Sequence, residues 1–284
     1  MIQNKNDIGI IGAGKVGTAL GGYLSAAGLP LSGYYDSVLP CAEDAAERTN
    51  TQCYGSLEEI ISQNTVMLMT VPDDAIASVW NLCRCFPVAG KTFIHCSGVL
   101  SSIVFSEHEK EGVYVGSLHP VCAVSNREAK EVFFGKFFVM EGDAHGIEIL
   151  KAWMNTTHNE YKIIRSEDKA RYHAAAVMSS NLVCALQQMG EDLLKDSGFD
   201  AQEAHQLLVP LLLGNVDNIA TKGCVEALTG PVERGDAGTV ARHLEALDGD
   251  MRETYRLLSL KLVALAQQKH PDTHYTNLLN VLKQ

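Results

Sequence analysis

The sequence has little positive charge for its length. Among 284 residues, 23 are lysine or arginine and 34 are aspartate or glutamate, which gives a formal net charge of −11. A field of that sign repels phosphate backbones and anionic lipid, so we expect neither nucleic acid nor a membrane surface as a partner. It leaves room for a small anionic ligand, because a local group of side chains can oppose the overall charge.

Long apolar runs and paired metal-binding motifs are also missing. No apolar run reaches the ~18 residues that a membrane-spanning helix needs. The N-terminal segment MIQNKND has no apolar signal core, which predicts a cytoplasmic protein. The cysteines include the pair Cys83 and Cys85 but no Cys-x-x-Cys. We therefore predict reduced, buried cysteines and no metal site.

Apolar residues, in contrast, make up 46% of the chain, which excludes intrinsic disorder and allows a sizeable core. In the first half, nearly continuous apolar runs predict strands at 6–14, 29–37, 65–72, 91–98, 112–120, 136–142 and 160–165. Helical patterns lie between several of them, at 15–28, 41–50 and 73–86. This alternation predicts an α/β domain with a mostly parallel, doubly wound sheet over residues 1–165.

After about residue 165 the pattern becomes wholly helical. One long helix is predicted over 167–195, and others follow at 201–221, 238–247, 250–269 and 273–283. Residues 166–284 are therefore predicted to form an all-α domain. Its leucines, such as Leu207, Leu208, Leu211, Leu212 and Leu213, exceed what one small helical domain can cover, which predicts a homodimer through this domain.

One glycine-rich segment fits the pattern G-x-G-x-x-G: Gly12, Ala13, Gly14, Lys15, Val16 and Gly17. It follows a predicted strand and opens a predicted helix, which is the context of the dinucleotide-binding turn of a Rossmann domain. The glycines allow a tight bend and close approach of a pyrophosphate, which the helix N-terminus then binds. The segment predicts that the α/β domain is a Rossmann domain.

Asp36 ends the second predicted strand, 19 residues after Gly17. An acidic residue there accepts hydrogen bonds from the adenosine ribose and repels a 2′-phosphate, which favours NAD over NADP. No arginine directly follows Asp36, and Arg48 could reach only from the next helix. The alternative is an ordinary turn aspartate.

Ligands of open parallel sheets bind at the carboxyl ends of the strands. Three further strand ends carry Val71 and Pro72, Ser97 and Gly98, and His119. We expect Val71 and Pro72 to contact the dinucleotide, and Ser97 and Gly98 to contact the nicotinamide ribose or the substrate. His119 is a supporting candidate for catalysis, although it could be an ordinary hydrogen-bonded turn residue.

Three polar residues share one face of the predicted long helix: Lys169, His173 and Asn181. We predict that His173 is the proton donor, because the unperturbed pKa of histidine is ~6.5. Asn181 could orient the substrate, and Lys169 could hold a carboxylate or lower the imidazole pKa. The alternative is a structural hydrogen-bond network.

A turn-rich loop at 228–236 interrupts the helical half. Thr229 and Arg234 in this loop are candidate substrate-binding residues, since arginine can bind a carboxylate bidentately. The alternative is a structural role, in which Arg234 pairs with Glu233 or Asp236.

Five segments, in this order, carry a resemblance to a known family: GAGKVGTAL, HCSG, GSLHP, YHAAAVMSSN and LTGPVERGD. The chain resembles bacterial Rossmann-like proteins with a helical C-terminal domain of unknown function, usually described as candidate NADP oxidoreductases. These are similar to pyrroline-5-carboxylate reductase, deazaflavin-dependent NADP reductases and the 6-phosphogluconate dehydrogenase group.

The resemblance implies a dinucleotide at Gly12, Gly14 and Gly17 and dimers through the helical domain, but supplies no substrate. The resemblance favours NADP. Asp36, however, stands where the family has an arginine-containing turn suited to NADP, so the sequence leaves both NAD and NADP as candidate cofactors.

Together these features predict an NAD(P)-dependent oxidoreductase that transfers hydride to or from a small polar carbonyl, imine or hydroxy compound. In this interpretation the helical domain closes a cleft over the nicotinamide. One alternative is hydride exchange between NADP and a deazaflavin coenzyme. Another is a sensor or scaffold that binds the dinucleotide without turnover.

Overall fold

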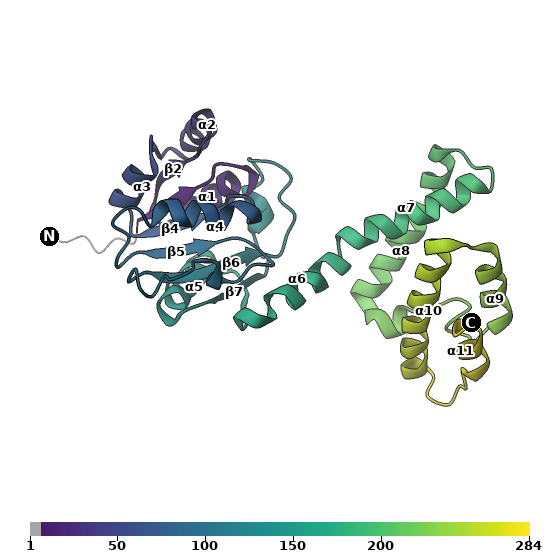
Figure 1. Cartoon of the computed structure of the whole chain (residues 1–284). Coiled ribbons are helices and arrows are strands. Elements are labelled where there is room, and N and C mark those ends of the chain that lie inside the picture. Colours follow the sequence, from purple (N-terminus) through teal and green to yellow (C-terminus); the bar gives the residue numbers. More distant parts are fainter. Residues whose placement is uncertain (1–6) are drawn as a thin grey trace. The chain divides into compact units, whose positions relative to one another are not determined.

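The computed structural model describes residues 7–284, so residues 1–6 of the segment MIQNKND lie outside the described part. The chain folds into two compact units, Met1–Met178 and Ser179–Gln284, here called the sheet unit and the helical unit (Figure 1). From the sequence, we predicted that the boundary between the two domains lies between residues 165 and 166. Residues 166–178 group with the sheet unit, where Lys169 bonds to Ser97 and Ser117.

The sheet unit is built on one eight-stranded sheet in the order β3-β2-β1-β4-β5-β6-β7-β8. Its strands are β1 (Ile8–Ile11), β2 (Leu31–Tyr35), β3 (Gln52–Cys53), β4 (Val66–Met69), β5 (Thr92–His95), β6 (Tyr114–Pro120), β7 (Phe138–Gly142) and β8 (Tyr161–Ile163). Every pairing is parallel except that of β6 with β7. The prediction of a mostly parallel sheet is confirmed.

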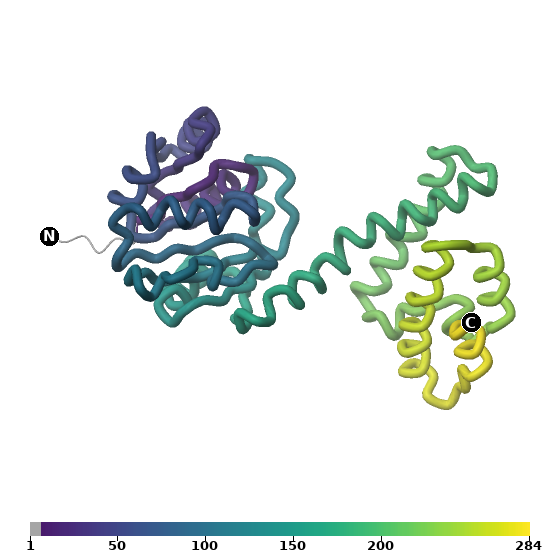
Figure 2. Tube along the Cα trace, in the orientation of Figure 1, coloured from purple at the N-terminus to yellow at the C-terminus, as the bar shows by residue number. Residues whose placement is uncertain are grey.

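Helices cover both faces of this sheet, and the chain trace alternates between strands and helices (Figure 2). They are α1 (Lys15–Ala26), α2 (Leu39–Thr49), α3 (Leu57–Gln63), α4 (Asp73–Cys83) and α5 (Ala144–Thr157). The short 3₁₀ turns are η1 (Ser102–Val104), η2 (Lys130–Phe133) and η3 (Ser166–Asp168), and η3 leads into α6 (Lys169–Met178), which extends away from the sheet (Figure 1). Ile10 packs in one core with residues of α1, α2 and α5. Ile11 and Met67 pack in a second core with residues of α3 and α4. Because side chains alternate along a strand, each strand contributes to both cores, which confirms the doubly wound fold.

The helical unit contains no strand among its described residues. Its helices are α7 (Asn181–Asp196), α8 (Ala201–Ala227), α9 (Ala237–Ala246), α10 (Gly249–Lys269) and α11 (Thr276–Leu282). A small core of residues from α9, α10 and α11, including Val240, Val263 and Leu278, confirms an all-α region. Within residues 7–284, no helix combines the length and the apolar character needed to cross a membrane.

The predicted single helix over 167–195 is wrong. The chain leaves the helical conformation between α6 and α7, where Ser180 has φ −133° and ψ −83°. Lys169 and His173 lie on α6, but Asn181 begins α7. The shared helical face predicted for all three residues therefore does not exist.

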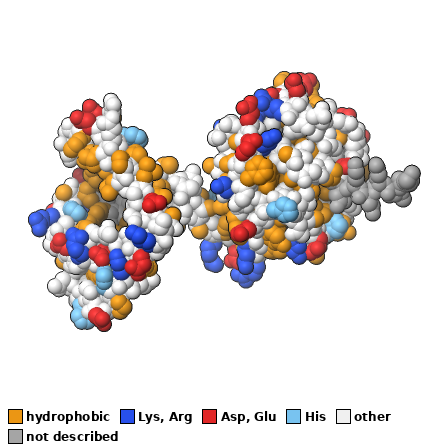
Figure 3. Space-filling view, turned by 180° about the vertical axis from the view of Figure 1, so that it is seen from behind, with side chains coloured by type: hydrophobic (Ala, Val, Ile, Leu, Met, Phe, Trp, Pro, Cys, Tyr) orange, Lys and Arg blue, Asp and Glu red, His pale blue; other side chains and the backbone are white. Residues whose placement is uncertain are grey.

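Large apolar side chains remain exposed on α7 and α8 (Figure 3). They are Leu182, Leu186, Leu207, Leu211, Leu213, Val216 and Ile219. Leu186, Leu211, Val216 and Ile219 also line a groove between the two helices. Contiguous exposed apolar surface of this kind marks an interaction surface.

Candidate functional site

The turn between β1 and α1 has the backbone that its glycines predict. Gly12 has φ +106°, a conformation that other residues rarely adopt. A Cβ on Gly17 would lie 2.1 Å from the Gly12 carbonyl oxygen, so only glycine allows α1 to pack this closely. Gly14 is exposed and caps α1 without a side chain. The first N–H groups of α1, from Lys15 and Val16 onward, therefore face outward as an anion-binding helix N-terminus.

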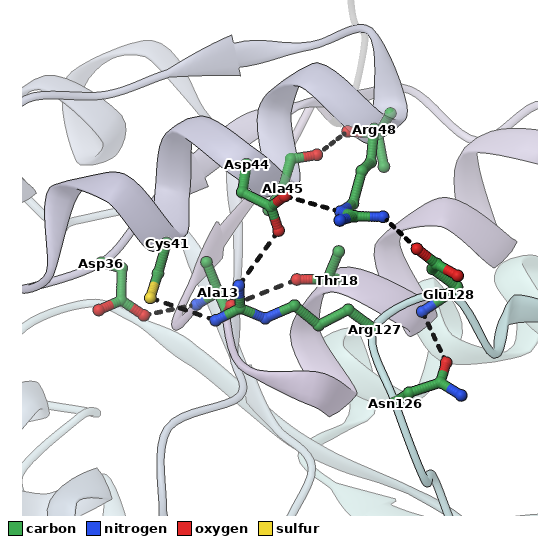
Figure 4. Close-up of polar contacts among 11 residues, drawn as sticks. Ala13, Thr18, Asp36, Cys41, Asp44, Ala45, Arg48, Asn126, Arg127 and Glu128 are labelled. Atoms are coloured by element: carbon green, nitrogen blue, oxygen red, sulfur yellow. Dashed lines mark hydrogen bonds and ion pairs between the residues drawn. The ribbon is translucent and has the colours of Figure 1, made fainter.

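Asp36 fastens this turn to the end of β2. Its Oδ2 accepts a hydrogen bond of 2.7 Å from the Ala13 N–H (Figure 4). Its Oδ1 accepts one of 2.9 Å from the Val38 N–H. A carboxylate has about four lone-pair sites, so Asp36 can still accept a hydroxyl donor from a ligand.

A cavity of about 280 Å³ opens beside the turn. Its wall includes Gly12, Gly14 and Asp36 together with Val71 and Pro72, as the strand-end argument predicted. Apolar side chains from α3 and α4, namely Leu57, Val79 and Leu82, complete the wall. An apolar wall beside a carboxylate suits a flat base attached to a ribose.

A second group of side chains gathers at the carboxyl ends of β5 and β6. His119 of β6 and His173 of α6 have ring centroids 5.8 Å apart. Both rings lie over Gly98: a Cβ there would be 2.4 Å from His173 Cδ2 and 2.8 Å from His119 Nε2. Because β1, β4, β5 and β6 run parallel, these imidazoles share a sheet edge with the glycine-rich turn between β1 and α1.

Tyr172 completes this group and was missed from the sequence. Its hydroxyl lies 2.6 Å from His119 Nδ1. Burial raises the pKa of Tyr172 to about 12, so the phenol stays protonated and can donate to Nδ1. Burial, aided by the charge of Lys169, lowers the pKa of His119 to about 4. His119 is therefore neutral near pH 7, and in the tautomer in which Tyr172 donates, the ring proton lies on Nε2, the atom beside Gly98. In the sequence, the signal for Tyr172 was its position directly before His173.

Lys169 is buried, with 1% of its surface exposed. Its ammonium group donates to the Ser97 carbonyl oxygen at 2.7 Å and to Ser117 Oγ at 3.0 Å. Burial lowers its pKa to about 8, and the charge of Glu141 works in the opposite direction. This placement contradicts the prediction that Lys169 holds a substrate carboxylate, and leaves the electrostatic effect on His119.

Glu141 is a buried carboxylate that sequence reasoning did not single out. It accepts hydrogen bonds from the Ser102 N–H at 2.6 Å, Ser102 Oγ at 2.9 Å and Ser166 Oγ at 2.7 Å. Ser166 lies three residues before Lys169. Glu141 thus fixes the start of α6 to the sheet and supplies an opposite charge to the buried ammonium group.

Ser97 does not offer its hydroxyl outward. Its Oγ donates to Asp73 Oδ2 at 2.7 Å and accepts from the Leu100 N–H at 3.0 Å and the Val99 N–H at 3.3 Å. The residue is 5% exposed. These contacts contradict the predicted ligand contact through this hydroxyl and give Ser97 the role of shaping the turn that presents Gly98.

Three predicted site residues belong to the helical unit: Asn181, Thr229 and Arg234. Asn181 is exposed, and its Oδ1 accepts a hydrogen bond of 3.1 Å from Ser180 Oγ. Thr229 and Arg234 are exposed in the loop between α8 and α9. Hydrogen bonds from Thr239 lower the pKa of Asp236, and the charge of Arg234 adds a smaller effect. Their substrate contacts stay predictions.

Buried His95 and half-buried His119 also predict a pH dependence of stability. Burial lowers the pKa of His95 to about 4, as it does for His119, whereas an unfolded histidine titrates near ~6.5. Between these values the unfolded chain binds more protons than the folded chain, so the free energy of unfolding falls as the pH falls. We expect the urea midpoint to decrease from pH 7 to pH 4.5, and to decrease less steeply in His95→Gln. A constant midpoint would contradict this.

Two family models match the chain. Residues 1–120 match the Rossmann-like domain, and residues 136–262 match a domain of unknown function, DUF2520. The chain combines a Rossmann-like domain with a DUF2520 domain. His119 lies within the Rossmann-like match, whereas Tyr172 and His173 lie within the DUF2520 match.

Solved structures share this architecture. The protein TM1727 from Thermotoga maritima is 26% identical, with a TM-score of 0.74 over 92% of this chain and 99% of its own. BF3122 from Bacteroides fragilis, named as a candidate NADP oxidoreductase, is 23% identical, with a TM-score of 0.67 over 92% of this chain and 98% of its own.

A reductive aminase from Aspergillus terreus, solved with NADPH and ethyl-5-oxohexanoate, is 14% identical, with a TM-score of 0.60 over 99% of this chain and 92% of its own. At this identity the likeness concerns the fold. No curated protein sequence matches the chain.

Proposed function

We propose that this protein is an NAD(P)-dependent oxidoreductase that transfers hydride between the dinucleotide and a small polar carbonyl, imine or hydroxy compound. The observation that carries the proposal is the pair of imidazoles, His119 and His173, over Gly98 on the same sheet edge as the phosphate-binding turn. Binding of a dinucleotide alone does not require two imidazoles beside Gly98, whereas hydride transfer requires a proton donor there.

The comparisons support the same class of reaction. BF3122 is named as a candidate NADP oxidoreductase, and the Aspergillus reductive aminase was solved with NADPH together with a carbonyl compound. The turn from Gly12 to Gly17 fits a dinucleotide, because Gly14 leaves open space at the uncapped start of α1. When bound, the nicotinamide supplies or accepts the hydride.

Residues of this chain would supply the hydrogen bond and the proton that the substrate heteroatom needs. His119 donates a hydrogen bond from Nε2 to the substrate heteroatom, and Tyr172 holds the ring in the required tautomer. His173 is half-buried, so it can give a proton to that heteroatom and recover it from solvent. Burial keeps His119 neutral, and the buried charge of Lys169 adds to this effect because it opposes protonation of the ring.

The test is turnover by the purified protein with NADH and NADPH against panels of carbonyl compounds and imines. We expect oxidation of the reduced nicotinamide with at least one class, at a rate that depends on substrate concentration. If dinucleotides bind but no class is turned over, a sensor role replaces this proposal. If neither dinucleotide binds, the proposed function is wrong altogether.

We also propose that the helical unit forms a homodimer through α7 and α8. Leu211 and Leu213 are 69% and 61% exposed, more than expected for leucines of a monomeric helix pair. Sedimentation equilibrium at micromolar concentration should give twice the chain mass. The double variant Leu211→Asp/Leu213→Asp should shift the protein toward monomer, while Ile103→Asp in the sheet unit should not. A monomer mass for the unaltered protein would refute the proposal.

A further inference from the structure

An arginine from a distant loop reaches the helix that follows Asp36. Arg127 lies in the segment between β6 and β7, and its guanidinium group contacts α2 at two places (Figure 4). One nitrogen lies 3.1 Å from Asp44 Oδ2, and another lies 3.2 Å from Cys41 Sγ. Arg127 and Cys41 are 86 residues apart in the sequence, so only the fold brings them together.

This position lies beside the adenosine end of the dinucleotide site. Cys41 belongs to the first turn of α2, five residues after Asp36. Asp36 in turn accepts the hydrogen bond from the Ala13 N–H of the phosphate-binding turn. In a Rossmann domain the ribose hydroxyls approach the end of β2, and a 2′-phosphate projects toward the turn that leads into α2. The guanidinium of Arg127 contacts the first turn of that helix at Cys41.

The guanidinium group also has bonding capacity to spare. It carries five N–H donors, and its two acceptors are one carboxylate and one thiol, which is a weak acceptor. The side chain is 33% exposed, so a ligand can reach it. A phosphate oxygen would be a much stronger partner than the thiol, because both members of the hydrogen bond are then charged.

Arg48, on the same helix, provides an instructive contrast. It contacts two carboxylates, Asp44 at 2.9 Å and Glu128 at 2.7 Å. It also lies two helical turns beyond Cys41, or about 10 Å farther along α2. Arg48 therefore has two carboxylate partners and lies farther from Asp36 along α2, whereas Arg127 has one carboxylate and one thiol as partners and contacts the first turn of α2.

We propose that Arg127 binds the 2′-phosphate of NADP(H). The proposal rests on the proposed function, since it assigns one subsite of the same dinucleotide site. Arg127 supplies from the β6–β7 segment the cation that the turn after Asp36 lacks, and so offsets the repulsion between Asp36 and the 2′-phosphate. The protein accordingly accepts NADPH as well as NADH.

Calorimetric titration of NADPH and NADH into the unaltered protein, Arg127→Gln, Arg127→Lys and Arg48→Gln tests this assignment. Arg127→Gln should weaken NADPH binding by about 10- to 100-fold, the range for a lost charged hydrogen bond. NADH binding by the same variant should stay within about twofold, which also shows that it is folded. Arg127→Lys should restore part of the NADPH affinity, and Arg48→Gln should leave both ligands unaffected.

A smaller pair of probes isolates the phosphate. Adenosine 2′,5′-bisphosphate should lose affinity for Arg127→Gln, and adenosine 5′-monophosphate should not. The assignment is overturned if the unaltered protein binds NADH but not NADPH, or if Arg127→Gln weakens both dinucleotides equally or neither. Failure of both dinucleotides to bind the unaltered protein would instead remove the proposed function on which the assignment rests.

Discussion

Replacing His173 by alanine should lower kcat for the hydride-transfer reaction by about 10²- to 10⁴-fold, the usual contribution of a general acid. Dinucleotide affinity should barely change, because His173 lies over Gly98 and not in the cavity beside the phosphate-binding turn. Steady-state kinetics with an identified substrate, combined with dinucleotide titration, separates the two quantities.

His145→Ala is the matched control, since His145 is an exposed histidine near the start of α5 that stacks on Tyr114, at the opposite end of β6 from His119. It should keep normal turnover. Near-normal turnover in His173→Ala would contradict the assignment of the proton donor. Loss of dinucleotide binding together with stability would show that His173 is a structural residue.

The second large effect concerns Gly14. A Cβ at this position meets no atom within 4 Å, so Gly14→Ala should fold as the unaltered protein does. The added methyl group nevertheless occupies the space through which a pyrophosphate approaches the start of α1. We expect dinucleotide affinity to fall by about 100-fold, or roughly 2.7 kcal/mol.

Gly17 and Gly22, two glycines within α1, provide comparisons for Gly14→Ala. At Gly22 a Cβ would make ordinary contacts, the nearest at 3.7 Å, so Gly22→Ala should bind dinucleotides normally. At Gly17 the same change collides with backbone and should cost stability as well as binding. Thermal unfolding and dinucleotide titration of the three variants distinguish these cases. Unchanged affinity in Gly14→Ala would mean that no pyrophosphate approaches this turn.

The sheet and the phosphate-binding turn were predictable because their signals are local. β1, β4 and β5 are buried along their whole length, and a strand buried on both faces appears in a sequence as a continuous apolar run. Gly12 and Gly17 are required by backbone geometry within a few residues of themselves. Such features need no knowledge of the rest of the chain.

The missed parts of the site depend on contacts between distant segments. Tyr172 reaches His119 across 53 residues, and Glu141 reaches Ser102 across 39. Periodicity shows which residues are buried or exposed, but not which buried polar groups meet. The break before Asn181 left a weaker signal: residues 179 and 180 are serines, which favour caps and turns, but the sequence contains no glycine or proline there.

The buried ammonium group of Lys169 has a consequence for chemical labelling. Burial lowers its pKa to about 8, but an amine that becomes exposed regains the pKa of an ordinary lysine. With 1% of the residue exposed, an acylating reagent cannot reach it while the start of α6 stays bonded to Ser97 and Ser117. Modification of Lys169 therefore requires the segment to open, and the rate at which a reagent labels it measures how often that local opening occurs.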